Sequence, residues 1–232
     1  FGFSKHLFTY QSKAYVGLKD SDPTGFNAFD PATGIITPMA NFPGGLINET
    51  PVSFVIGDKG YIFLEGPYPS IWEYNFSTNQ WTNKGNKPLP NRHSAVVFVA
   101  DGKAYIGLGW ETATINGQSF RLYKKDWIQF TPGSAYAAVK ANFPGIAREG
   151  GTGFVINNNI YLGFGLNNTA SNPSHVPQLK DFWKYNTANN TWIRQPDYPG
   201  YWIVGLADNV KNIGSFSLGS TGYIVTGALN EF

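Results

Sequence analysis

The alternation of apolar and polar segments along the chain predicts short β-strands joined by tight turns. Apolar runs such as 96–99 and 104–106 recur, and small or polar residues such as 100–103 separate them. Two apolar runs joined by a short polar segment are typical of a β-hairpin. The near-continuous apolar runs indicate strands buried on both faces, as in stacked sheets. No long stretch has helical periodicity, so we predict an all-β fold.

The hairpin pattern repeats along the whole chain. Five tyrosines each have a phenylalanine seven residues before them and an aliphatic residue directly after them. They are Tyr15, Tyr61, Tyr105, Tyr161 and Tyr223. The spacing between successive tyrosines is 46, 44, 56 and 62 residues. A fixed period of this length is the sign of a repeat architecture.

Each hairpin is followed by a second unit that recurs four times. An aromatic strand, a turn rich in Pro, Asn, Thr and Gly, and a final strand are followed by a proline-bearing link. Four short strands in each repeat predict β-propeller blades, whereas a single β-sandwich would not need the same aromatic residue at the same offset. We predict one propeller domain over 1–232, with four full blades and half of a fifth. The expected blades are 1–45, 46–90, 91–145, 146–200 and the partial 201–232.

The repeats resemble the kelch family. The clearest copy runs from Gly150 to Gly200, and the fragment IWEYNFSTNQW at 71–81 carries the same pattern. Tyr74 and Trp81 in that fragment have the kelch spacing of about seven residues between Tyr and Trp. The family's double glycine is replaced by Gly-Leu-Gly and Gly-Phe-Gly, and the Trp is lost in the first and third repeats. The variant DFWKYN…W…PG is similar to kelch domains of secreted or surface-anchored proteins from Bacteroidetes-type bacteria.

Composition narrows the classes of function. The chain is 42% hydrophobic, 16% aromatic and only 14% charged, with a net charge of +2. Such a chain buries a core, unlike a disordered one, and it has no basic run to neutralise nucleic-acid phosphates. No stretch approaches the roughly 18 apolar residues of a membrane-spanning helix. The chain starts at Phe1 and no signal peptide is visible in it, so we infer a processed or trimmed chain whose targeting segment is not part of this sequence.

The absence of cysteine excludes thiolate chemistry. Disulfides, thiolate zinc sites and a cysteine nucleophile are ruled out because the chain has no Cys. The three histidines lie far apart and lack a metal-binding spacing. We therefore predict no metal and no cofactor. The resemblance implies galactose oxidases as possible relatives, but their copper site needs a cross-linked Cys, which this chain does not have.

The segments between the second and third strands predict a binding face. In repeats three and four they are about ten residues longer than in repeats one and two, with 25 and 24 residues between the flanking aromatics against 14 and 13. Because strand direction alternates within a blade, these segments lie on the same face as the links between blades. Enlarged loops on one face indicate a ligand or partner site.

The candidate site residues lie in those loops and links, outside the repeat register. They are Trp110, Arg121 and His175 in the loops, and Arg92, Arg148, Tyr201 and Trp202 on the links. Trp110 and Trp202 are expected either to stack on a sugar ring, to anchor a protein interface, or only to cover a loop base. The arginines either bind backbone carbonyls of neighbouring blades or line the channel mouth for an acidic ligand.

These observations favour a binding protein over an enzyme. We expect a non-catalytic binding or scaffold module, extracellular or in the cell envelope and part of a larger assembly there. It would dock a protein partner on its loop face, since kelch propellers commonly do so. The alternatives are a glycan-binding propeller and, by the kelch resemblance, a sugar-active enzyme of the mutarotase type that uses channel Arg and Glu residues. Neither nucleic acid nor a transmembrane segment is expected.

Overall fold

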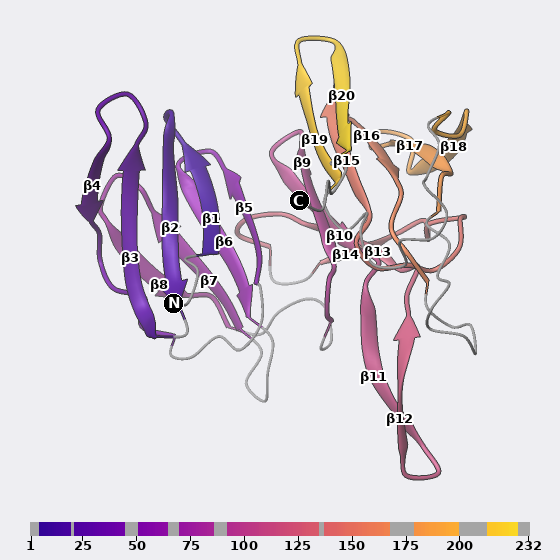
Figure 1. Cartoon of the computed structure of the whole chain (residues 1–232), viewed down its shortest axis with the longest axis horizontal. Helices are drawn as coiled ribbons and strands as arrows, with labels where there is room; N and C mark the ends of the chain where they lie inside the picture. The colour runs from indigo at the N-terminus through magenta and orange to yellow at the C-terminus, as the bar shows by residue number, and fades with distance from the viewer. Residues whose placement is uncertain are drawn as a thin grey trace, which may run out of the picture. The chain divides into compact units, whose positions relative to one another are not determined.

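The regular elements of the chain are β-strands (Figure 1). The computed structural model describes residues 5–19, 21–44, 51–64, 70–85, 92–134, 137–167, 179–199 and 213–226. Within those ranges no helix is long and apolar enough to cross a membrane. The chain separates into two compact units, residues 1–92 and 93–232, and each is described by itself.

The first unit contains two four-stranded antiparallel sheets in which strands pair in sequence order. The first sheet consists of β1 (Lys5–Tyr10), β2 (Lys13–Lys19), β3 (Asp22–Asp30) and β4 (Ile35–Pro38). The second consists of β5 (Val52–Ile56), β6 (Lys59–Leu64), β7 (Ser70–Asn75) and β8 (Gln80–Asn83). Each sheet is one blade of the predicted kind.

The second unit contains two more such sheets and two hairpins. One sheet consists of β9 (Val96–Ala100), β10 (Lys103–Gly107), β13 (Trp127–Phe130) and β14 (Ala138–Lys140). The other consists of β15 (Thr152–Ile156), β16 (Asn159–Gly163), β17 (Phe182–Asn186) and β18 (Thr191–Gln195). The hairpins are β11 (Trp110–Ile115) with β12 (Gln118–Tyr123), and β19 (Ile213–Leu218) with β20 (Thr221–Thr226). The prediction of four full blades and half of a fifth is confirmed, and a single ring over 1–232 stays a prediction.

The repeated phenylalanine and tyrosine are direct cross-strand partners. Phe98 faces Tyr105 across the β9–β10 turn, and the same pairing occurs in the other four hairpins. A seven-residue offset produces this pairing because a two-residue turn lies midway between the two positions. In the third blade Tyr105 is buried in a core with Trp127 and Leu162. The repeat signature in the sequence is therefore the signature of the hairpin core.

Contacts among five residues, here called the inter-blade lock, join the two blades of the first unit. The Asn79 side-chain oxygen accepts hydrogen bonds from the Tyr74 hydroxyl at 2.7 Å and from the Ala40 backbone N–H at 2.8 Å. The Trp81 indole N–H donates to the Ala40 carbonyl at 3.0 Å. Phe42, two residues further along the link, packs edge-on against Trp81. These contacts tie the link after the first blade to the outer strands of the second.

The second unit contains the same lock between its two full blades. Asn190 accepts from the Tyr185 hydroxyl and from the Ala141 N–H, both at 2.8 Å, and the Trp192 indole donates to the Ala141 carbonyl at 2.9 Å. Phe143 packs edge-on against Trp192. Both links have the sequence Ala-Asn-Phe-Pro-Gly. The two blade pairs thus share the same contacts between their blades, so residues at matching positions in the two units can be compared directly.

Candidate functional site

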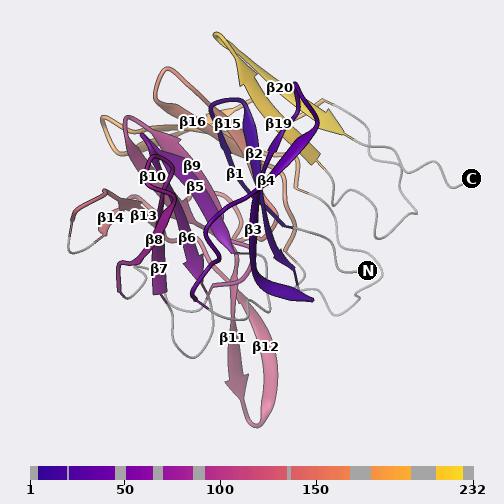
Figure 2. The same cartoon turned by 90° about the vertical axis from the view of Figure 1, so that its left-hand side faces the viewer.

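The enlarged segment of the third repeat is a β-hairpin inserted between β10 and β13. It turns at Asn116 and Gly117, whose φ angles are +51° and +77°, as expected for an Asn-Gly hairpin turn. Figures 1 and 2 show that the hairpin β11–β12 projects from the sheet that carries it. The predicted long loop is therefore a regular element, because its residues alternate well enough to pair as strands.

The two faces of this hairpin differ in chemistry. Side chains alternate along a strand, so Phe120 and Leu122 share one face, while Trp110 and Arg121 share the other. Phe120 and Leu122 are 49% and 46% exposed. A two-stranded hairpin is marginally stable by itself in water. A projecting hairpin that exposes two large apolar side chains on one face is thus a surface that would gain stability from a partner.

At the base of the hairpin, Trp110 lies between a histidine and an arginine. His93, on the link into the third blade, pairs with Trp110 in an antiparallel bridge, and its ring stacks on the indole at 4.0 Å. The Arg121 guanidinium lies 4.5 Å from the centre of the same indole. His93 lies on one side of β11, and Arg121 lies on β12, on the other side. The Trp110 ring is therefore held between their side chains.

A carboxylate from the next link completes this group. Glu149 accepts a hydrogen bond from Arg121 at 2.7 Å and one from the Tyr123 hydroxyl at 3.2 Å. Burial acts to lower the pKa of Arg121, but Tyr123 and Glu149 outweigh it and raise that pKa. We call His93, Trp110, Arg121, Tyr123 and Glu149 the hairpin-base cluster. It joins the inserted hairpin to the links into the third and fourth blades.

The two link arginines predicted as ligand contacts are buried. Arg148 is 0% exposed, and its guanidinium forms two 2.7 Å hydrogen bonds with the Asp181 carboxylate. It also donates to the carbonyls of Ile146 and Phe164 at 2.8 and 2.9 Å. Arg92 is buried as well. The sequence left two roles open for Arg148, binding backbone carbonyls or lining the channel mouth, and these contacts show carbonyl binding. The pairing of Arg148 with Asp181 was not predicted.

The remaining predicted residues divide into two groups. Trp110 and Arg121 are brought together in the hairpin-base cluster, and Arg121 keeps 52% of its side chain exposed. His175, Tyr201 and Trp202 lie outside the described residues. Sequence reasoning missed Tyr123 as a member of the cluster. Its signal is the strand alternation over 118–123, which places Tyr123 on the same face as Arg121.

The hairpin-base cluster presents a rigid aromatic and cationic surface. The indole faces are covered by His93 and Arg121, so a sugar ring would have to displace Arg121 before it could stack on Trp110. The Trp110 indole N–H is buried and has no hydrogen-bond acceptor among the described residues.

In those same parts of the chain no group of three or more His, Asp and Glu side chains could hold a metal ion.

Comparisons with known proteins support the propeller fold. No family model matches the chain. It is 25% identical over 206 residues to the Kelch-like protein terF of Aspergillus terreus, covering 79% of this chain and 41% of that protein. It is 26% identical over 144 residues to an N-acetylneuraminate epimerase of Salmonella arizonae, covering 62% of this chain and 33% of that protein. The chain thus spans less than half the length of either curated relative.

A solved structure extends the likeness to three dimensions. The structure of YjhT superimposes with a TM-score of 0.64 at 18% identity, covering 87% of this chain and 67% of YjhT. At this identity the match concerns the fold. Together with the two curated relatives and the sheets described above, it identifies the fold as a kelch-type β-propeller.

Proposed function

We propose that this chain of kelch-type propeller blades is a binding module that docks a protein partner through the hairpin β11–β12 and the hairpin-base cluster. The observation that carries the proposal is the projecting hairpin, whose exposed face holds Phe120 and Leu122. We further propose that the module acts outside the cell or in the cell envelope, as part of a larger assembly.

The chemistry of the hairpin supports a protein partner. Protein interfaces have their energetic centres in aromatic residues and arginine, surrounded by apolar contacts that exclude water. Phe120 and Leu122 provide the apolar contacts, and Arg121 provides a half-exposed cation on the opposite face. Because Trp110 and Glu149 hold Arg121 in place, little side-chain entropy is lost when a partner contacts it.

A sugar ligand is the second candidate, and the comparison with an N-acetylneuraminate epimerase favours it. In the glycan-binding form, Arg121 would swing away and leave one face of Trp110 for a sugar ring. In the mutarotase-type form, Glu149 and Arg121 would serve as the channel carboxylate and guanidinium. The arrangement observed favours protein docking over both, since Arg121, Glu149 and Trp110 are already engaged with one another.

The test compares hairpin variants with a matched control. Purified wild-type protein, Phe120→Asp and Arg121→Ala are used to capture partners from the native cell-envelope fraction, and the captured partner is then purified for affinity measurement. Arg194→Ala is the control, because Arg194 also lies over a tryptophan, Trp183, at 5.2 Å and pairs with a carboxylate, but on the outer strand β18. A glycan array with the same proteins tests the sugar alternative.

We expect Phe120→Asp and Arg121→Ala each to weaken partner binding at least tenfold, a loss of about 1.4 kcal/mol, with Arg194→Ala unchanged. Equal weakening by all three variants, or by none, would contradict docking through the hairpin. A sugar bound by the wild type and bound as well or better by Arg121→Ala, which uncovers one face of the Trp110 indole, with no protein partner, would instead establish the glycan-binding alternative.

A further inference from the structure

The groove between the two blades of the first unit is filled with aromatic rings. Phe76, at the β7–β8 turn, stacks on Tyr10 at 4.1 Å with the rings 10° from parallel. It also contacts Tyr15 and Tyr74 at 4.8 and 5.2 Å. Met39 packs against the same core. This end of the blade pair is therefore covered by partly buried apolar side chains that pack against the core.

The second unit has the same frame but different residues at the three filling positions. Numbered from the matching tyrosines and the shared link sequence, Tyr10 corresponds to Ala100, Phe76 to Thr187, and Met39 to Lys140. The second unit thus has a methyl group and a hydroxyl-bearing side chain where the first unit stacks two aromatic rings. It also has the ammonium of Lys140 where the first unit has the thioether of Met39. These three positions lie on different strands or turns. Thr187 and Lys140 line the same groove, and Ala100 directly precedes Asp101, which also lines it.

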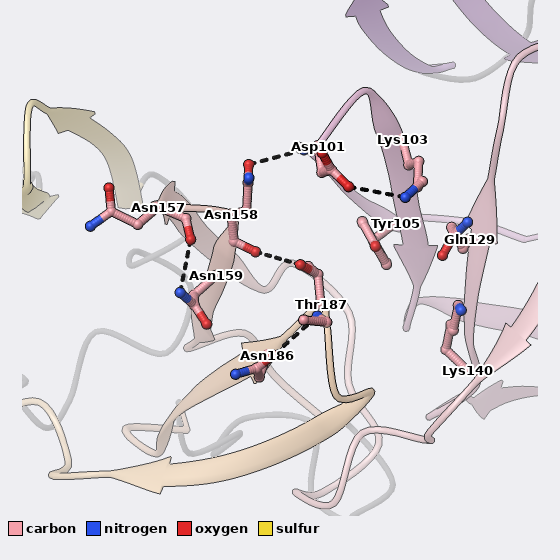
Figure 3. Close-up of a pocket in the computed structure, with 11 residues that line it drawn as sticks. Asp101, Lys103, Tyr105, Gln129, Lys140, Asn157, Asn158, Asn159, Asn186 and Thr187 are labelled. Atoms are coloured by element: carbon pink, nitrogen blue, oxygen red, sulfur yellow. Dashed lines mark hydrogen bonds and ion pairs between the residues drawn. The ribbon is translucent and has the colours of Figure 1, made fainter.

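A polar pocket occupies that groove in the second unit (Figure 3). Its volume is about 560 Å³, within the 300–1,000 Å³ typical of small-molecule sites. Figure 3 shows Lys140 and Gln129 on one side, and Asn159, Asn186 and Thr187 on the other. Tyr105 also lines the pocket but is almost fully buried, so it offers no aromatic face for stacking.

Among the described residues that line the pocket, Lys140 is the cation without a carboxylate partner. Lys103 is neutralised by Asp101 at 3.0 Å. No carboxylate of the described residues forms an ion pair with Lys140. One compact ammonium without a partner suits one carboxylate, whereas a doubly charged phosphate is usually held by several cations or backbone N–H groups.

The remaining polar groups are oriented by contacts with the turns. The Asn186 side-chain oxygen accepts the backbone N–H groups of Ala188 and Asn189, both at 3.0 Å, so its amide N–H groups are left for another acceptor. Asn159 donates to the Asn157 carbonyl at 2.9 Å, which leaves its own side-chain oxygen as an acceptor. Paired amide donors and acceptors fixed in place match sugar hydroxyls, which both donate and accept.

We propose that this inter-blade pocket binds a small sugar acid of the hexuronate type, with its carboxylate on Lys140 and its hydroxyls on Asn159, Asn186, Thr187 and Gln129. The site is separate from the hairpin-base cluster and does not depend on the proposed docking function. It adds a small-molecule site, formed by strands and turns of the third and fourth blades, to a module whose partner surface is the inserted hairpin.

The experiment is calorimetric titration of the whole chain at low ionic strength with glucuronate, galacturonate, glucose and inorganic phosphate. We expect at least one hexuronate to bind saturably and glucose to bind at least tenfold more weakly. Lys140→Met, which introduces the residue found at this position in the first unit, should weaken hexuronate binding at least tenfold. Lys125→Met is the matched control, since Lys125 is an exposed lysine outside the pocket.

A second variant fills the pocket in the manner of the first unit. Ala100→Tyr combined with Thr187→Phe should abolish hexuronate binding, while the melting temperature stays at or above that of the wild type. No hexuronate binding by the wild type, or equal binding by Lys140→Met, would overturn the proposal. Phosphate binding that is tighter than hexuronate binding would also overturn it, in favour of a simple anion site. Arg121→Ala should leave hexuronate binding unchanged, which keeps this test separate from that of partner docking.

Discussion

Replacement of Arg148 by methionine should strongly destabilise the second unit. Arg148 is fully buried and donates four hydrogen bonds, two to Asp181 and two to backbone carbonyls. Its guanidinium also lies 4.7 Å from the centre of the Phe143 ring in the link between blades. Methionine has a similar length, so it removes the charge and the donors while leaving much of the packing volume in place.

The magnitude follows from what the variant leaves behind. The Asp181 carboxylate, only 15% exposed, would keep the Trp183 indole N–H at 2.8 Å but lose its counter-ion. Breaking a buried ion pair by removing one partner costs about 3–5 kcal/mol. Each kcal/mol shifts the melting temperature of a protein of this size by about 2–4 °C, so the expected fall is about 6–20 °C.

Thermal unfolding followed by circular dichroism provides the assay, with two controls. Arg194→Met removes a half-exposed arginine from a half-exposed carboxylate, Asp197, and should cost only about 1 kcal/mol or less. Arg148→Met combined with Asp181→Leu removes both buried charges and should recover part of the loss. If Arg148→Met melted together with Arg194→Met, the buried pair would not stabilise the fold and the reasoning would be refuted.

Three further predictions concern the same unit. Although burial acts to raise it, the pKa of Asp181 is held below its ordinary value by Arg148, with Trp183 and Arg194 adding to the effect. The stability from this carboxyl is therefore fully present above its unfolded-state pKa of about 3.9 and is lost as the pH falls through the lower native pKa; acid titration of the double variant should lack this component. Asn190→Gly keeps the backbone freedom needed at a φ of +55° but removes two hydrogen bonds of the inter-blade lock. Urea unfolding should show that the free energy of unfolding falls by about 1–3 kcal/mol. A fall near zero would mean that water replaces these hydrogen bonds. Gly165→Ala should destabilise more than Gly133→Ala, since both have positive φ but only the methyl group at 165 would overlap a backbone carbonyl; equal losses would exclude the overlap as the cause.

The blades could be predicted from the sequence because their register is a local property. Phe98 and Tyr105 are separated by seven residues and face each other across one tight turn. A turn of fixed length sets strand pairing, and pairing sets which side chains share a core. The same reasoning explains why the offset recurs at Phe216 and Tyr223, where the structure describes only two strands of a blade.

The partners of the link arginines could not be predicted, because they depend on how the chain folds back between blades. Arg148 and Asp181 are 33 residues apart in sequence. Nothing in the local pattern around Arg148 distinguishes a buried arginine from one at the channel mouth. The inserted hairpin is an intermediate case, since the length of the segment showed an expansion but not its regular pairing from Trp110 to Tyr123.

The inter-blade pocket shows what an alignment of repeats can and cannot reveal. Matching the repeats places Thr187 opposite Phe76, which shows that an aromatic residue has been lost. It does not show that Phe76 stacks on Tyr10 from the neighbouring blade, so the coincident change to Ala100 has no meaning in sequence alone. Only the contact across blades shows that the differences at these two positions are related.

The preserved lock around this pocket favours function over a packing defect. Full burial of a phenylalanine contributes about 1.5–3 kcal/mol, of which the partly buried Phe76 gains a share, and an aromatic pair adds about 0.5–1.5 kcal/mol. The second unit has neither contribution at Thr187 and Ala100, although it retains every contact of the Asn190 lock. A sequence that departs from good packing at one place in a well-kept frame does so most often at a functional site. A simple defect would gain stability on filling and lose nothing else, whereas a binding site would gain stability and lose its ligand. The filled variant distinguishes these cases because it measures both quantities in one protein.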